Sequence, residues 1–350
     1  MKKRNAILTL AAAALLAGLL ALGSRYLGGY AMRILNLSAI YVVLALSLNL
    51  LNGFTGLFSL GSSGFMAVGA YVSALLTMSP EVKEMNFFLE PLAPALAGLR
   101  LPFIPALAAA GLCAALAGLV IALPVLRLRD DYLAIATLGF SEIIRVLITN
   151  AQSLTNGAQG LKNIPKSATT WTVWGTAALA VAFMALLTRS SYGRMLKAVR
   201  DDEVAAEAMG VNVFRVKVAS FTISSFMAGV GGALLGHMIT TIDPKMFTFM
   251  LTFNILLIVV LGGNGSITGS VIASIAVTVL MEAMRFLDGP LNLGLVKTEG
   301  LPGLRMVVFS AMLMAVVIFR QRGLMGDREL TWDALADSGL LPRRRKGGAA

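Results

Sequence analysis

Apolar residues along the chain form long, nearly uncharged stretches, separated by shorter segments that hold most of the charged residues. Five or six of the stretches approach or exceed 18 residues, the length of a membrane span rather than of a buried core helix. At 1.5 Å per residue, a helix of this length crosses most or all of a hydrocarbon core of about 30 Å. The pattern therefore predicts an all-α fold, a polytopic bundle of membrane-spanning helices.

About ten such helices are predicted when the shorter stretches are included. They cover residues 6–23, 33–51, 57–78, 103–126, 132–149, 172–188, 216–240, 247–262, 266–287 and 304–319. The stretch 247–262 would reach only about 24 Å, so it is either a short span or half of a helix broken at the following glycines. The first stretch follows three basic residues and fits a retained anchor or a cleaved signal peptide, and cleavage would leave nine helices.

Charge sets the predicted orientation. The chain is 57% hydrophobic and 13% charged, with a formal net charge of +11. With the N-terminus inside, 18 of the 29 lysines and arginines fall in inside segments and 7 in outside loops. This asymmetry predicts that both termini are cytoplasmic. It also explains the basic balance by membrane topology, so no nucleic-acid partner is expected.

Several kinds of chemistry are excluded by residue counts. The single cysteine, Cys113, allows no internal disulfide, and the single histidine, His237, allows neither a histidine-based metal site nor a Ser-His-Asp triad. His237 is expected to be packed or at an interface rather than to relay protons. Gly56 and Gly61 have the spacing of a phosphate-binding loop, but serine follows where such a loop needs lysine. The chain is therefore expected to bind no cofactor or metal and to catalyse no reaction.

The loop between two spans at residues 189–217 is longer than a helix connection needs. Good helix formers without proline run from Arg194 to Met209, with acidic residues at 201–203, and Gly210 is a stop signal. The residues predict one short helix, for which two interpretations stay open. It either docks into a groove on a cytoplasmic partner, or it lies on the lipid surface, held by basic side chains.

Charged and small residues inside the spans also have two interpretations each. Glu142 and Arg145 stand at i, i+3 on one predicted helix, and Glu282 and Arg285 repeat this spacing. Each pair is either a structural ion pair near the membrane edge or, for the first, a feature of a permeation route that meets a zwitterion. The glycines of the third span either only allow close helix packing or mark a helix that bends at an interface.

In combination, several short runs resemble the permeases of branched-chain amino acid ABC importers. They are 59–61 (SLG), 64–71 (GFMAVGAY), 131–140 (DYLAIATLGF), 142–145 (EIIR), 155–157 (TNG), 160–161 (GL), 200–203 (RDDE), 205–210 (AAEAMG), 261–266 (LGGNGS) and Gly269. The resemblance extends from about residue 40 to residue 325. The run 132–140 is similar to the second of the two paralogous permeases that such importers pair. Asp130 and Ser141 stand where the family usually has glycine.

The resemblance implies one permease domain over residues 1–325, with the coupling loop at 189–217, and a charged cytoplasmic tail over 326–350. It implies a bacterial inner-membrane protein that pairs with a paralogous permease, two cytoplasmic ATPases that use ATP and Mg²⁺, and an extracytoplasmic amino-acid-binding protein. The substrates would be leucine, isoleucine and valine. Urea, short amides and other amino acids are alternative substrates, and a secondary transporter or a membrane scaffold are alternative classes.

The resemblance also implies two sets of site residues. Those expected to couple to the ATPase are Arg200, Asp201, Asp202, Glu203, Ala205, Ala206, Glu207, Ala208, Met209 and Gly210. Those expected along the translocation pathway are Gly61, Gly64, Gly69, Tyr71, Glu142, Arg145, Asn156, Gly262 and Gly263.

Overall fold

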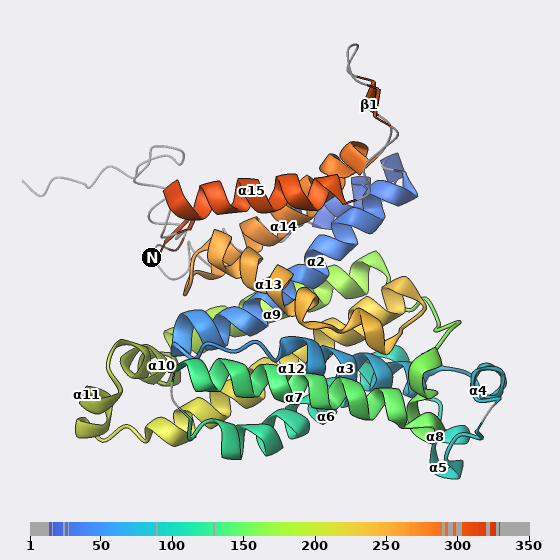
Figure 1. Cartoon of the computed structure of the whole chain (residues 1–350), viewed down its shortest axis with the longest axis horizontal. Coiled ribbons are helices and arrows are strands. Elements are labelled where there is room, and N and C mark those ends of the chain that lie inside the picture. The colour runs from blue at the N-terminus through green and yellow to red at the C-terminus, as the bar shows by residue number, and fades with distance from the viewer. Residues whose placement is uncertain are drawn as a thin grey trace, which may run out of the picture.

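A computed structural model of the chain describes residues 14–15, 17–23, 25–26, 28–88, 90–128, 130–288, 291–292, 297–298, 303–319, 323–326 and 329. Parts of the predicted first span and most of the predicted tail lie outside the described residues. The fold is an all-α polytopic bundle (Figure 1). Its α-helices are α2 (Gly29–Asn49), α3 (Ser62–Thr77), α4 (Pro80–Asn86), α5 (Pro94–Ala97), α6 (Phe103–Val125), α7 (Asp130–Asn150), α8 (Gln152–Thr155), α9 (Thr170–Arg189), α10 (Ser191–Asp201), α11 (Glu203–Ala208), α12 (Val213–Ile239), α13 (Phe249–Gly262), α14 (Ile267–Ala283) and α15 (Leu304–Phe319).

The remaining described elements are short. A π-helical segment, η1 (Leu50–Thr55), extends α2, and 3₁₀ turns form η2 (Gly157–Gln159), η3 (Pro244–Met246) and η4 (Met284–Asp288). Two strands, β1 (Leu291–Asn292) and β2 (Lys297–Thr298), pair antiparallel with Leu291 opposite Thr298.

Six helical segments in the described part of the chain are long and apolar enough to cross a membrane. They are Gly29–Thr55, Phe103–Val125, Tyr132–Asn150, Thr170–Arg189, Val213–Ile239 and Pro244–Gly262. The helices Ser62–Thr77 and Ile267–Ala283 are apolar but shorter. The prediction of a polytopic helical membrane protein is confirmed.

Two predictions need correction, and the alternative left open for residues 247–287 is decided by the structure. The third span begins at Ser62 and not at residue 57, because Gly56 adopts a φ of 77° and the chain leaves the helix there. The stretch 247–287 is two helices, α13 and α14, joined by a turn over residues 263–266. The single helix expected between Arg194 and Met209 is divided at Asp202, whose backbone is extended.

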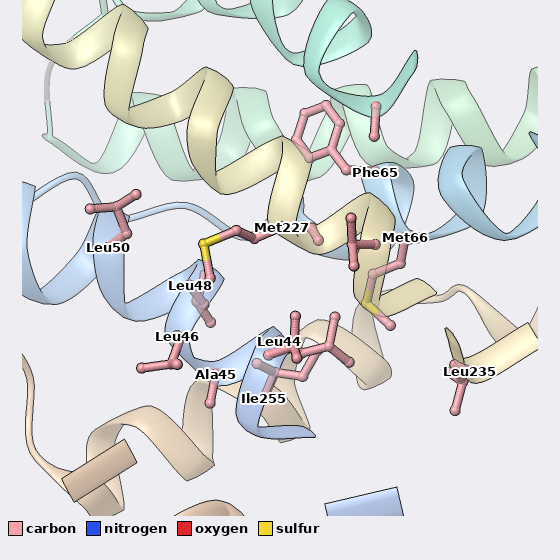
Figure 2. Close-up of a cluster of buried hydrophobic side chains, with 14 of the residues drawn as sticks. Leu44, Ala45, Leu46, Leu48, Leu50, Phe65, Met66, Met227, Leu235 and Ile255 are labelled. Atoms are coloured by element: carbon pink, nitrogen blue, oxygen red, sulfur yellow. The ribbon is translucent and has the colours of Figure 1, made fainter. Parts of the chain in front are cut away.

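Helices α2 and α12 form the centre of the bundle. Over the most apolar 18 residues of each segment, 72% of the residues are buried in α2–η1 and 67% in α12, against 28% in α7 and 17% in α9. Leu44, Leu48 and Met227 from these two helices meet Phe65 and Met66 of α3 in the core, next to Ile255 of α13 (Figure 2). Helices α7 and α9, which have open apolar faces, therefore lie at the outside of the bundle around this core.

Small residues allow the central helices to approach closely. A Cβ atom added to Gly69 of α3 would overlap the backbone of Gly229 on α12. Gly229 in turn faces the side chain of Ala114 on α6 and lies 3.1 Å, measured from an added Cβ, from the carbonyl oxygen of Ala110. Contacts of this kind replace the hydrophobic driving force that lipid does not provide between helices.

The two ends of the bundle differ. Helices α10 and α11 lie together at one end, which we call the α11 end, and α4, α5 and α8 lie at the other, the α4 end (Figure 1). At the α4 end, Leu161 and Ile242 exchange backbone hydrogen bonds of 2.9 Å, which fasten the loop before α9 to the loop after α12.

Candidate functional site

The break between α10 and α11 is made by Asp202. Its backbone has φ −162° and ψ 114°, so the helix cannot continue through it. The carboxylate then accepts hydrogen bonds from the amides of Val204 and Ala205, at 2.9 and 3.0 Å. This is the N-cap arrangement that aspartate favours, and it begins α11 in a new direction.

The end of α11 is equally well defined. The amide of Gly210 donates to the carbonyl of Glu207 at 2.9 Å, and that of Val211 donates to the carbonyl of Ala206 at 3.0 Å. These two bonds form a Schellman motif, which needs a left-handed residue at the position of Gly210. Gly210 has φ of 84°, a conformation that side-chain-bearing residues other than asparagine rarely adopt.

One side of α11 is anchored to the bundle. Ala206 is buried, and the carboxylate of Glu203 forms an ion pair of 2.5 Å with Lys217 of α12, whose side chain is 10% exposed. Next to it, the hydroxyl of Tyr192 on α10 donates to the carbonyl of Val216 at 2.9 Å, and burial raises the pKa of Tyr192 to about 12. These contacts hold the position of α11 relative to α12.

The opposite side of α11 is apolar and open. Val204 is 78% exposed and Met209 is 84% exposed, and Ala205 and Ala208 are exposed between them. We call these four residues the α11 patch. Asp201, Asp202 and Glu207 are also exposed around it. Exposed apolar residues that are held in a fixed position and rimmed by charge are typical of a protein interaction site.

Arg200 differs from its neighbours because its side chain lies against the bundle. It forms an ion pair of 2.9 Å with Asp201, and its guanidinium donates to the carbonyl oxygen of Gly53 in η1 at 3.2 Å. Lys197, one turn earlier, lies over the ring of Phe54 at 6.0 Å. Helix α10 therefore contacts the π-helical end of α2 directly.

The residues predicted along the translocation pathway include two glycines at the start of α3, against which α7 packs. A Cβ atom on Gly61 would lie 2.8 Å from the carbonyl oxygen of Thr137, and one on Gly64 would lie 2.9 Å from the Cα of Ser141. The hydroxyl of Thr137 accepts from the amide of Leu60 at 3.0 Å, and Ser63 and Ser141 share a hydrogen bond of 2.9 Å. Ser141, which stands where the permeases that this chain resembles usually have glycine, thus takes part in the packing of α7 on α3.

The ion pair of α7 lies at the edge of this packed face, because Arg145 follows Ser141 by four residues. Arg145 Nε donates to Glu142 Oε2 at 2.7 Å, and the two side chains are 29% and 37% exposed. The apolar residues exposed along this helix are Tyr132, Ile135, Ile143, Val146 and Leu147. The charged pair therefore lies at the boundary between the packed face of this membrane-spanning helix and its open, mainly apolar face, where lipid alone would be a costly neighbour.

The remaining predicted pathway residues do not join this pair. Tyr71 is buried, and its hydroxyl has no hydrogen-bond partner among the described residues. Asn156 donates to the carbonyl of Gly160 at 2.7 Å in a turn next to α8, at the α4 end. Gly262 packs on Gly269 where α13 and α14 meet. The structure thus separates these residues into packing contacts, a loop turn and the open face of α7.

His237 is a packed residue, as predicted. Its Nδ1 lies 2.8 Å from the carbonyl oxygen of Pro165, and its Nε2 lies 2.6 Å from the hydroxyl of Ser73. Since a carbonyl only accepts, Nδ1 donates to Pro165, while the hydroxyl of Ser73 can either donate to Nε2 or accept from it. Among the described residues, no group of three or more His, Cys, Asp or Glu side chains could hold a metal ion.

Comparison with known proteins gives one family. A family model described as the permease component of branched-chain amino acid transport systems matches residues 30–317. The high-affinity branched-chain amino acid transport system permease protein LivM of Escherichia coli K12 is 36% identical over 286 residues, covering 72% of this chain and 63% of the relative. The chain therefore spans less than two thirds of that relative's length.

More distant relatives match as well. The probable branched-chain amino acid transport permease protein LivM of Methanocaldococcus jannaschii is 23% identical over 323 residues, covering 83% of this chain and 92% of the relative. The permease protein LivH of Escherichia coli K12 is 28% identical over 214 residues, covering 56% of this chain and 64% of the relative. No solved structure matches the chain.

Proposed function

The chain belongs to the family of branched-chain amino acid transport permeases, and from that membership we propose that it is one of two membrane subunits of an ABC importer for leucine, isoleucine and valine. The identity is higher to the protein named LivM than to the one named LivH. This supports a LivM-like role beside a LivH-like sister permease in the inner membrane.

The α11 patch is the observation that carries this function. An importer permease without its own ATP site needs a surface through which partner ATPases can move it. The patch is exposed, apolar and fixed to α12 through the Glu203–Lys217 pair. A short helix held this way fits a groove on a cytoplasmic protein better than it fits lipid, because its exposed acidic residues would meet the headgroups.

The orientation of the bundle in the membrane follows from the assignment of the α11 patch to the ATPases. The α11 end faces the cytoplasm, in agreement with the excess of lysine and arginine in the segments assigned there. The α4 end then faces outward, where α4, α5 and α8 are accessible to a substrate-binding protein (Figure 1). Closure of the ATPases would move α10 and α11, and the bundle would alternate between outward and inward access.

We place the substrate route along the open face of α7, next to the sister permease. Glu142 and Arg145 would offer one charge to each end of a zwitterionic amino acid, and the apolar residues around them would accept its side chain. No residue contact selects branched-chain amino acids over urea or short amides, so substrate identity rests on the family and the names of the relatives.

The coupling surface can be tested with paired variants. Met209→Asp places a charge in the centre of the proposed interface and should abolish co-purification of the ATPases and ATP-driven uptake, whereas Met209→Leu should preserve both. Gly210→Pro and Glu203→Lys should also abolish uptake while the protein still inserts. Gly210→Asn should retain it, since asparagine tolerates the left-handed conformation. Normal uptake by Met209→Asp and Gly210→Pro would refute the assignment.

A further inference from the structure

The LGGNGS run at 261–266 forms the turn between α13 and α14, which the proposed function leaves without a role. This turn lies against the end of α2. Gly265, with φ of 86°, donates its amide hydrogen to the side-chain oxygen of Asn49 at 2.8 Å. The turn is therefore held by a buried side chain from a distant part of the sequence.

Asn49 uses its whole side-chain amide on this turn. Its nitrogen donates to the carbonyl of Ser266 at 2.9 Å and to the hydroxyl of Ser270 at 2.8 Å. Asn49, Ser266 and Ser270 are each fully buried. Because a buried amide that loses a partner loses much of its net hydrogen-bond stabilisation, the three bonds fix α2 to the start of α14 as one unit.

Arg200 reaches the same place from α10. Three glycines, Gly53, Gly56 and Gly265, form a notch around its side chain, which we call the glycine notch. Added Cβ atoms on Gly56 and Gly265 would lie 3.0 Å from Arg200 Cγ and 3.2 Å from a guanidinium nitrogen. A Cβ on Gly53 would overlap Asn49 and the amide of Gly265. The side chain of Arg200 therefore fits in the glycine notch only because these three positions carry no side chain.

The turn is also held from its other side. The carboxylate of Glu329 accepts from the amides of Ile267 and Thr268 at 2.6 and 3.2 Å. The amide of Leu324 donates to the carbonyl of Leu261 at 2.8 Å. The turn between α13 and α14 is consequently held by α10 and α2 and, in addition, by Leu324 and Glu329.

We propose that Arg200, seated in the glycine notch, and Asn49 form a coupling node that carries movement of α10–α11 into α2, α13 and α14. The node rests on the proposed function, because it needs ATPases that move α11. Arg200 and Asn49 are positioning residues: neither contacts the substrate. The π-helical η1 supplies the connection, since its Gly53 carbonyl accepts from Arg200 while the preceding Asn49 binds the turn.

The first test removes the Arg200 contact in the intact complex. Reconstituted transporter carrying Arg200→Gln should import about threefold to tenfold fewer amino acid molecules per ATP hydrolysed, the effect of losing one ordinary hydrogen bond. Arg200→Lys, which can still donate to Gly53, should recover much of this ratio. Arg127→Gln removes an equal charge from the exposed turn after α6 and should leave the ratio unchanged.

The ratio separates coupling from folding, because a smaller amount of folded transporter lowers import and hydrolysis together. The second test is a double-mutant cycle of Arg200→Gln with Asn49→Ala. The combined loss should be smaller than the two separate losses multiplied, as expected when both residues act in one connection. If Asn49→Ala does not assemble, Ser270→Ala removes one Asn49 partner, and Thr278→Val is its control, because Thr278 is also buried and its hydroxyl bonds to Ser274 within α14.

The outcomes distinguish the two proposals. If wild-type complex imports amino acids with ATP and Arg200→Gln keeps the wild-type ratio, or the two losses simply multiply, the node is wrong and the importer assignment stands. If wild-type complex imports no branched-chain amino acid, the proposed function fails. A lowered ratio in Arg200→Gln that Arg200→Lys restores supports the node.

Discussion

Two glutamate–arginine pairs with the same i, i+3 spacing occur in α7 and at the end of α14, and their surroundings differ. Glu142 stands about 12 Å along the axis from the end of α7, and its pair with Arg145 is partly buried. Glu282 is one residue from the end of α14, and Arg285 is 63% exposed. The second pair also has a partner, because Tyr30 donates to Glu282 and Arg285 donates to Tyr30.

The comparison shows that the position along the helix and the neighbouring side chains distinguish the two pairs, whereas the i, i+3 spacing does not. A charge near the centre of a membrane helix costs about 2.5–3.5 kcal/mol on insertion scales, and this cost falls toward the interface. The α14 pair, with its tyrosine, is therefore explained by local structure. The α7 pair is not, and we expect it to serve transport.

The largest expected effect comes from splitting the α7 pair. Glu142→Gln leaves Arg145 without its partner at the edge of the packed face of α7, so uptake should fall by about tenfold or more. The double variant Glu142→Gln/Arg145→Gln removes both charges and should restore insertion while uptake stays low. The measurement for both variants is the uptake of labelled leucine in vesicles, normalised to the amount of inserted protein. Recovery of transport in the double variant would show that the pair is only structural.

A smaller effect is expected from moving α7 without touching the pair. Gly64→Ala would bring a methyl group to within 2.9 Å of the Cα of Ser141, and such overpacking costs about 1–3 kcal/mol. Uptake and thermal stability should both fall. Gly139→Ala is the control on α7 itself, because nothing lies within 4 Å of the added atom. Equal behaviour of the two variants would contradict the close α3–α7 contact.

The smallest effects are expected at α14. Glu282→Gln removes an ion pair at the end of the helix whose arginine is 63% exposed, and pairs that solvent reaches contribute about 0–1 kcal/mol. Uptake should stay within about twofold of wild type, since that range corresponds to a few tenths of a kcal/mol. Tyr30→Phe should change it even less. A loss as large as that of Glu142→Gln would show that the two pairs have equivalent roles.

Much of the fold could be predicted because lipid imposes long apolar helices. The predicted span 103–126 and the helix α6 (Phe103–Val125) differ by one residue, and the predicted last span matches α15 (Leu304–Phe319). Predictions failed where a single capping bond or a tertiary contact decides the backbone. The division at Asp202 depends on its own capping bonds, and the late start of α3 depends on Gly56, whose positive φ places it beside Arg200.

The site was only partly predictable for the same reason. Residues 200–210 could be found from helix formers, charge and a terminal glycine, which are local signals. Asn49 could not, because its partners at 265, 266 and 270 are more than 200 positions away in the sequence. An asparagine in an apolar span is the only signal available, and it points to a buried polar contact without naming the partner.

The central claim is that partner ATPases, acting through α10 and α11, drive import by this permease. The most direct measurement is leucine uptake into proteoliposomes that contain this chain, its sister permease and the ATPases, with binding protein added on the substrate side. We predict uptake only when ATP is supplied to the ATPases, and none when Met209→Asp replaces the wild-type chain. Uptake driven by an ion gradient in the absence of ATPases would contradict the account.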